Sequence, residues 1–388
     1  MPCRPPVALV AALVMLCAAP TAHASFPGPN GKIAFESTAS KNGIGLINAD
    51  GGAFASLVTS SAARQMDPAF SPDGRLVAFA QGRDLWVAPA NGSTAPRRLT
   101  SAGLNDQYPA FSPDGKKLAF LRNDAAADIW VIGVDGKGLT DLTNESASSE
   151  YAPQWSPDGK RIAFTHDACE RPSESGPCVW VMNADGSGKT NLTPEDLRSE
   201  CPAFAPGNSH RNHSAEPTWS PDGRMIAFTG HYDICVDDPA VNSSDIWVMN
   251  ADGSGKRDLT SADKTVDRQP TWSPDGTGIA FVREPADRSD AELFRIPVIG
   301  GAATQITNNS EPDEDPDWGR AAPPCVVPKV TGKTLARARR AILKADCRLG
   351  KVTKKRSSKK RGTVIKQRPA AGKRAVSGAK VSVTVAKR

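Results

Sequence analysis

The stretch Pro217-Thr218-Trp219-Ser220-Pro221-Asp222-Gly223, followed by Met225-Ile226-Ala227-Phe228, decides the fold because it recurs along the chain. Related copies are PAFSPDGRLVAF from Pro68, PAFSPDGKKLAF from Pro109, PQWSPDGKRIAF from Pro153 and PTWSPDGTGIAF from Pro270. Self-similarity with a period of about 40 to 50 residues indicates a repeat architecture, in which each copy is one structural unit.

Each copy contains four short strand-like segments. The first holds Pro-x-Trp or Pro-x-Phe, the second an Ile-Ala-Phe-type run, the third an Ile-Trp-Val-type run, and the fourth ends in Leu-Thr or Ile-Thr. Ser-Pro-Asp-Gly joins the first two, because proline fixes φ, aspartate bonds its own backbone and glycine takes the left-handed region. Four antiparallel strands per repeat of this length are typical of a β-propeller blade.

The copies at the two ends are incomplete in complementary ways. Asn30-Gly31-Lys32-Ile33-Ala34-Phe35 has no Pro-x-Trp strand before it, whereas Asp315-Pro316-Asp317-Trp318-Gly319 matches that strand and no further copy follows it. Pairing of these two segments would close a ring and leave no exposed sheet edge. The sequence therefore predicts an all-β fold over residues 25–320, a six-bladed β-propeller closed by a C-terminal strand.

Residues 1–24 have the features of a secretory signal peptide. They combine Arg4, a short apolar run over residues 7–17 and the cleavage site Ala22-His23-Ala24. That run is too short to span a bilayer, and no later stretch is longer and apolar. We expect an exported chain that begins at Ser25 and has no membrane span.

The cysteines agree with export, since the number that remains after the signal peptide is even. Their spacing favours bonds between sequence neighbours. The expected pairs are Cys169–Cys178, Cys201–Cys235 and Cys325–Cys347. No C-x-x-C motif is present, which argues against a cysteine zinc site.

Residues 325–388 differ sharply in charge from the rest of the chain. They carry 21 Lys and Arg and one acid, Asp346, whereas the remainder carries 27 basic and 41 acidic residues. A Pro-Ala linker at 321–324 precedes this region, in which Thr334 can cap an amphipathic helix and strand-like runs follow at 349–353, 362–367 and 380–386. A second, small α+β domain is predicted.

A run of cations over residues 351–361 is expected to form a loop between two of those strands. The candidate polyanion-binding residues are Lys354, Lys355, Arg356, Lys359, Lys360 and Arg361. Such a loop favours wall carboxylates or phosphates through salt-sensitive contacts. No aromatic residues lie between the charges to stack bases, so nucleic acid is not expected. The alternatives are a solvated loop or one that docks on the acidic propeller.

Four histidines follow the signal peptide, and all fall where the repeats are interrupted, between His166 and Ser244. They are His166, His210, His213 and His231. Histidine and nearby aspartate can bind a transition metal, but this irregular segment has no fixed ligand spacing, which favours polar loop histidines. G-x-S-x-G, P-loop and dinucleotide signatures are absent. We expect neither a metal, nor another cofactor, nor catalysis, and look to the interrupting loops for binding.

The repeat W-S-P-D-G-x-x-I-A-F…I-W-V-M-N-A-D-G…L-T resembles the TolB-like (WD40-like) propeller repeat over about residues 26–320. This resemblance implies a ring that binds a protein or peptide partner without catalysis. A related propeller lyase family uses histidine-bound manganese, which leaves a metal-dependent polysaccharide lyase as the alternative.

The C-terminal region resembles a PASTA domain over residues 325–388. Val327-Pro328 to Leu335 matches V-P-x-x-x-G-x-x-L, Gln367 to Gly372 matches Q-x-P-x-x-G, and 381–385 matches the closing strand. The resemblance implies a cell-wall protein. The combined expectation is a monomeric, non-enzymatic protein of the envelope whose partners are an envelope protein or peptide and peptidoglycan or another anionic wall polymer.

Overall fold

The computed structural model describes residues 26–37, 43–58, 63–124, 126–144, 148–167, 177–194, 213–233, 242–261, 265–285 and 290–387. The expected signal peptide lies outside these residues. Regular structure in the described part is strand except for one helix, which confirms the all-β class of the main body. None of the helical structure in these ranges is long and apolar enough to cross a membrane.

The repeats fold into four-stranded antiparallel units, with the Pro-x-Trp or Pro-x-Phe segment first in each. Three of them are separate sheets. Their strands are β4 (Gln65–Phe70), β5 (Leu76–Gln81), β6 (Asp84–Pro89) and β7 (Arg97–Arg98); β8 (Asp106–Phe111), β9 (Lys117–Asn123), β10 (Ala127–Gly133) and β11 (Thr140–Asp141); and β12 (Glu150–Trp155), β13 (Arg161–His166), β14 (Cys178–Asn183) and β15 (Thr190–Asn191).

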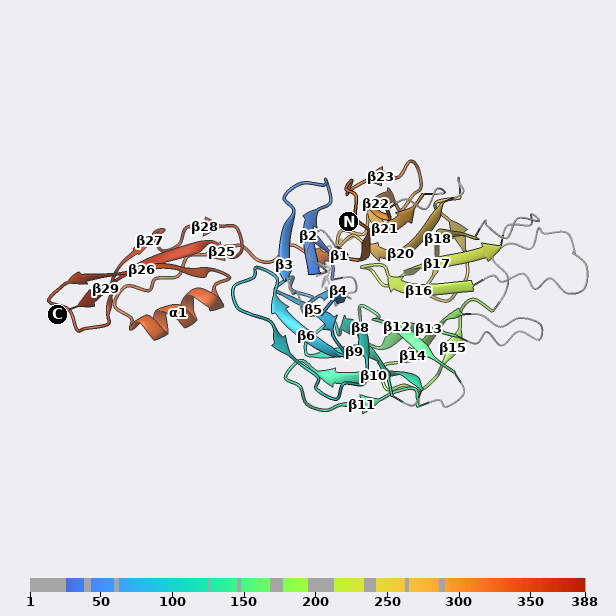
Figure 1. Ribbon diagram of the computed structural model, residues 1–388, viewed down its shortest axis with the longest axis horizontal. Helices are drawn as coiled ribbons and strands as arrows, with labels where there is room; N and C mark the ends of the chain where they lie inside the picture. The colour runs from blue at the N-terminus through green and yellow to red at the C-terminus, as the bar shows by residue number, and fades with distance from the viewer. Residues whose placement is uncertain are drawn as a thin grey trace, which may run out of the picture.

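Two further units share one eight-stranded sheet, because a single parallel pair, Ser244 with Val266, joins them. Their strands are β16 (His213–Trp219), β17 (Met225–Asp233), β18 (Asn242–Asn250) and β19 (Arg257–Asp258), then β20 (Val266–Trp272), β21 (Gly278–Glu284), β22 (Glu292–Pro297) and β23 (Thr304–Gln305). Figure 1 shows the units arranged around a common centre.

The remaining unit combines the two ends of the repeat region. Its order is β24 (Asp313–Arg320), β1 (Asn30–Ser37), β2 (Gly43–Asn48) and β3 (Ala55–Val58). Ile33 pairs with Trp318 and Ala34 with Asp317. The expected pairing of the first and last segments is therefore present.

The core lies between successive units. The phenylalanines of the Ile-Ala-Phe-type strands are all less than 2% exposed: Phe35, Phe79, Phe120, Phe164, Phe228 and Phe281. Each hydrophobic cluster draws on two neighbouring units, as where Trp155 and Ile162 pack on Ala119 and Val131. Burying one such aromatic side chain contributes about 1.5–3 kcal/mol, so the units stabilise one another around the ring.

The Ser-Pro-Asp-Gly turns have the expected structural role. In the first, Ser71 Oγ donates to Asp73 Oδ1 at 2.7 Å and accepts from Leu76 N at 2.9 Å, while Gly74 has φ +67°. The same serine–aspartate bond recurs in the four other copies, at 2.6–2.7 Å.

The C-terminal domain follows β24 and projects from the side of the ring that carries β3 and β6 (Figure 1). It contains β25 (Cys325–Val326), α1 (Leu335–Lys344), β26 (Arg348–Arg356), β27 (Val364–Arg368), β28 (Arg374–Ala375) and β29 (Lys380–Lys387). Thr334 caps α1 by accepting from Arg337 N, and the buried face of the helix, Ala338 and Ile342, lies in one cluster with β29. The expected Cys325–Cys347 disulfide is present.

Candidate functional site

The first strand of every unit carries a bulge at the residue before its recurring proline. These residues all have φ between +50° and +57°: Asp67, Tyr108, Ala152, Glu216, Gln269 and Asp315. A positive φ is uncommon for residues other than glycine, and its recurrence points to a built feature. All of them line one cavity of about 100 Å³ where the first strands converge, which we call the channel.

Four of the channel residues are acids: Asp67, Glu216, Asp315 and Asp317. Asp67 Oδ2 accepts from Tyr108 N at 3.2 Å, and Glu216 Oε2 accepts from Thr229 Oγ1 at 2.8 Å and from Gln269 N at 3.0 Å. The Gln269 amide donates to Asp315. Burial raises the pKa of Asp67 to about 7, and burial together with the neighbouring acids raises the pKa of Asp315 well above its ordinary value. Burial also raises the pKa of Glu216.

Arginines compensate the acids beside the channel. Arg64 contacts Glu36 and lies 3.5 Å from Glu314, while Arg268 Nη2 lies 2.8 Å from Glu314. Carboxylate oxygens of Glu36, Glu314 and Asp315 lie within 4.8 Å of one another, close enough for one cation. Because Arg64 and Arg268 already pair with two of these acids, we assign no metal here.

The channel acids were missed by reading the sequence. The available signal was the residue before each recurring proline, which differs from copy to copy while the motif around it does not. The residue types before these prolines form no recognisable motif in the sequence. The bulge seen in the structure is what identifies them as a group.

The structure gives His166 a structural position. Its Nε2 lies 3.5 Å from Glu150 Oε1, and its ring stacks on Trp180 with centroids 4.9 Å apart. The equivalent position in the preceding unit is Arg122, which pairs with Asp106 through bonds of 2.7 and 2.8 Å and lies over Trp130.

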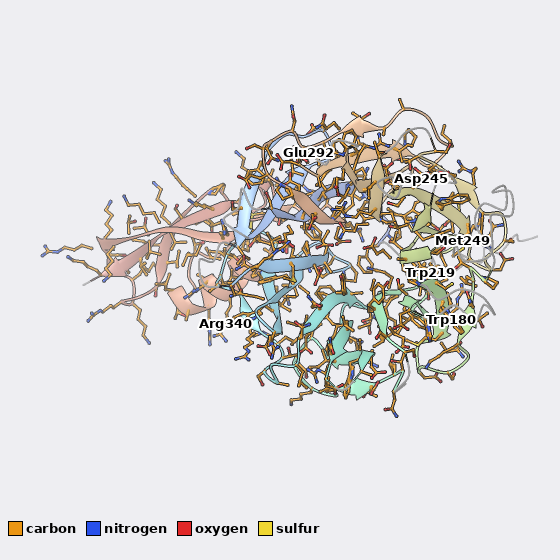
Figure 2. The ribbon with its side chains drawn as sticks, turned by 45° about the vertical axis from the view of Figure 1, so that its right-hand side comes forward. Trp180, Trp219, Asp245, Met249, Glu292 and Arg340 are labelled. Carbon is orange, nitrogen blue, oxygen red and sulfur yellow. A yellow bond between two sulfur atoms is a disulfide. The ribbon has the colours of Figure 1, made fainter. Side chains whose placement is uncertain are left out.

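The same register recurs in the unit of β20 to β23, where Arg283 pairs with Asp267 and lies over Phe294. His166 thus takes the place of an arginine in a repeated acid–base–aromatic contact. Figure 2 labels Trp180 together with Trp219 and Met249, in the part of the ring remote from Arg340 of the C-terminal domain.

Of the other predicted site residues, the backbones of His213 and His231 are direct partners across β16 and β17. Cys178 is disulfide-bonded. The remaining residues of these predictions, His210, Cys169, Cys201 and Cys235, lie outside the described ranges, so the expected Cys169–Cys178 and Cys201–Cys235 pairs stay predictions.

The cationic run is only partly a loop. Lys354, Lys355 and Arg356 belong to β26, because parallel pairing with β29 continues as far as Arg356 opposite Lys387. The expectation of a loop is wrong for these three residues and correct for the turn that holds Lys359, Lys360 and Arg361. All six side chains are exposed. The one acid of residues 325–388, Asp346, binds Arg75 of the ring at 2.6 Å and leaves these cations without a neighbouring acid of their own domain.

Comparison with known proteins agrees with both parts of the chain. The family model of the TolB beta propeller domain matches residues 30–210, and that of the PASTA domain matches residues 326–387. A Tol-Pal system protein TolB of Anaeromyxobacter dehalogenans is 46% identical over 70 residues, 18% of this chain and 14% of that protein. The uncharacterized peptidase YuxL of Bacillus subtilis is 34% identical over 74 residues, 19% and 10% of the two chains.

These alignments span less than a fifth of each curated relative. Among solved structures, TolB from Acinetobacter baumannii superposes with a TM-score of 0.58 at 19% identity, covering 75% of this chain and 67% of that one. Identity at this level establishes the fold alone. The chain joins a TolB-type β-propeller to a C-terminal PASTA domain.

Proposed function

We propose that this protein is an exported, non-enzymatic binding protein of the cell envelope. The ring, residues 25–320, binds a protein or peptide partner, and the PASTA domain, residues 325–388, binds peptidoglycan or another anionic wall polymer. The linker at 321–324 connects the two, and residues 1–24 direct export.

The observation that carries the proposal for the ring is the group of buried carboxyl side chains in the channel. The acids Asp67, Glu216, Asp315 and Asp317 line it, and no Lys, Arg or His is among the described residues that do. Buried carboxylates gain most from a cation that replaces their lost hydration. We therefore expect the partner to insert a lysine or arginine side chain at this point.

A site-specific crosslink tests the proposal for the ring. A photoreactive phenylalanine analogue at Tyr108, which lines the channel, should capture a polypeptide in the native envelope. The same analogue at Phe54, which is 49% exposed and away from the channel, serves as the matched control. Combining the Tyr108 probe with Glu216→Gln and Asp315→Asn should abolish capture, because neither side chain can then ionise to pair with a cation, while both keep their shape.

Two outcomes contradict it. Capture that is unaffected by the two neutral substitutions means that the channel charge plays no part. Recovery of glycans alone, with their cleavage, would replace the binding function by the metal-dependent lyase considered above.

Retention on purified cell wall tests the proposal for the PASTA domain. The full chain should bind at low ionic strength and elute by about 0.5 M salt, because exposed charges are screened within a few ångströms there. Replacing Lys359, Lys360 and Arg361 with glutamine should weaken retention. The matched control removes the same number of charges from α1, at Arg337, Arg339 and Arg340. Equal loss in both variants would show a dependence on net charge and contradict a site at the turn.

A further inference from the structure

A second cavity, of about 1220 Å³, lies between the ring and the PASTA domain. Its ring side includes the start of β1 with Lys32, strands β2 and β3, the turns at Arg75 and Asn91, Arg295 of β22 and Arg320 of β24. Its other side includes Leu343 of α1, the segment from Asp346 to Arg348 and the turn at Val376. We call this cavity the interdomain groove. Clefts between domains are favoured positions for ligands because both walls contribute contacts.

Two contacts hold the walls in place. Arg75 grips Asp346 through Nε at 2.6 Å and Nη2 at 2.8 Å, and the Asp346 side chain is only 13% exposed. Gly378 lies against Asn91 so closely that an added Cβ would be 3.0 Å from the Asn91 Cβ. The PASTA domain thus uses its one acid to dock on the ring.

The charge that remains in the groove is positive. Arg75 and Asp346 compensate each other, which leaves Asp50 as the one other acid in the lining. The remaining cations of the lining are Lys32, Arg295, Arg320 and Arg348. Burial lowers the pKa of Lys32, whose Nζ donates to Ala53 O at 2.6 Å. An anionic ligand would give the Lys32 ammonium group polar contacts in place of the water that burial removes.

The groove also exposes aliphatic surface. Leu343 is 40% and Val376 79% exposed, and both line the groove together with Leu46 and Leu57. Guanidinium groups recognise carboxylates in a bidentate manner, whereas the apolar side chains gain only from hydrocarbon. A polyphosphate has no hydrocarbon groups with which to cover the apolar side chains.

We propose that the interdomain groove binds a short acidic peptide segment with aliphatic side chains. Its carboxylates would pair with Arg295, Arg348 and Lys32, and its aliphatic groups would cover Leu343 and Val376. The site is separate from the basic turn, because β26 runs from Arg348 at the groove to Arg356 at the far end, a length of about 26 Å. It depends on neither the channel partner nor wall binding.

Fluorescence anisotropy of the full mature chain with one defined probe tests this. The probe is a rhodamine-labelled, blocked hexapeptide of alternating glutamate and leucine. Combining Arg295→Gln with Arg348→Gln should weaken its affinity at least about tenfold, as expected when two charge contacts are lost. The control Lys160→Gln with Arg224→Gln removes two exposed cations from turns outside the groove and should leave affinity within about twofold.

Two further variants separate binding from folding. Val376→Glu should also abolish binding, because it places a like charge in the groove at an exposed position. Asp346→Asn should weaken binding while leaving the lining cations in place, since the two walls lose the ion pair between them. A probe with glutamine in place of glutamate should bind poorly to every variant.

Three results overturn the proposal. One is unchanged affinity in the Arg295/Arg348 variant. Another is displacement of the peptide by inorganic polyphosphate that itself depends on Arg295 and Arg348, which would make the groove a phosphate site. The third is loss of peptide affinity only on replacing Lys359, Lys360 and Arg361, which would place binding at the basic turn. Wall retention, measured in parallel, fails or succeeds separately, because the groove variants keep that turn.

Discussion

Buried ionisable side chains occur in two different arrangements in the ring. In two units an acid on the first strand grips an arginine on the second, and in a third unit Glu150 faces His166 instead. By contrast, Asp67, Glu216 and Asp315 accept hydrogen bonds in the channel, and its described lining residues include no cation. The acid–base pairs hold the first and second strands of a unit together, whereas the channel acids are available to pair with a cation of a partner.

Replacing Asp67 with asparagine should raise the melting temperature at pH 7.5. The folded pKa of Asp67, about 7, exceeds its ordinary value of 3.8, so the native state holds its proton more tightly than the unfolded chain. Its contribution to stability is complete below about pH 4 and is lost as the pH rises to about 7. Asparagine keeps an acceptor for Tyr108 N and avoids this loss.

Calorimetry at pH 4.5 and pH 7.5 measures the effect. The difference in melting temperature between the two pH values should shrink in the Asp67→Asn variant and stay unchanged in Asp290→Asn, where the acid is exposed. An equal pH dependence in all three proteins would show that Asp67 is not the group responsible.

Arg122→Gln should cost about 3–5 kcal/mol of unfolding free energy, since it leaves the buried Asp106 without its partner. Arg122 and Asp106 are 4% and 0% exposed. Urea denaturation would measure the loss, and Arg97→Gln, at an exposed position, is the control. If Arg122→Gln were as stable as the control, the ion pair would have no structural role.

At the scale of elements, β24 matters most because it joins the two ends of the ring. It covers β1 with Trp318, which belongs to the same cluster as Ile33 and Phe35. Without it, β1 would present both an unpaired edge and apolar side chains to solvent, a combination that favours aggregation.

Truncation tests the role of this strand. A chain that ends at Glu311 should aggregate or fail to fold, whereas one that ends at Ala322 should remain a soluble monomer by size-exclusion chromatography with light scattering. Both lack the PASTA domain, so the comparison isolates β24. A monomeric, folded product of the shorter chain would contradict closure by this strand.

The whole molecule combines two bodies of different stability. The PASTA domain has about 60 residues, a size at which burial alone gives marginal stability. Its Cys325–Cys347 bond closes a loop of sequence separation 22, which constrains the unfolded chain by about 3 kcal/mol. The ring has six mutually packed units and does not depend on this bond.

Replacing Cys325 and Cys347 with alanine should therefore unfold the PASTA domain selectively. Amide hydrogen exchange read by mass spectrometry should show lost protection in α1 and β29, with β5 and β9 unchanged. Because the Arg75–Asp346 ion pair connects the two domains, a small rise in exchange at the ends of β5 is expected and would not contradict the prediction. Unaltered protection in α1 would mean that the core alone maintains the domain.

The elements that followed from the sequence are those with local causes. The Ser-Pro-Asp-Gly turns, the buried Ile-Ala-Phe strands and the Thr334 cap each depend on residues within a few positions, and the structure confirms them. The basic run was partly misplaced because strand β26 is extended by pairing with β29, some 30 residues later. The role of His166 was missed because it depends on Glu150 and Trp180 together.

The sequence by itself determined the blades, the complementary ends, and the contrast between an acidic main body and a basic C-terminal region. Repetition and turn chemistry depend on short segments, and net charge is a sum over residues, so none of them requires knowledge of tertiary contacts. Only the tertiary structure decided which side chains meet. A bulge in each first strand brings Asp67, Glu216 and Asp315 into one channel, although Asp67 and Asp315 lie at opposite ends of the ring sequence. The docking of Asp346 on Arg75 likewise creates a groove that neither domain has alone. Both results arise from closure and docking over long distances in the chain, where one residue's neighbours are set by the packing of all the others.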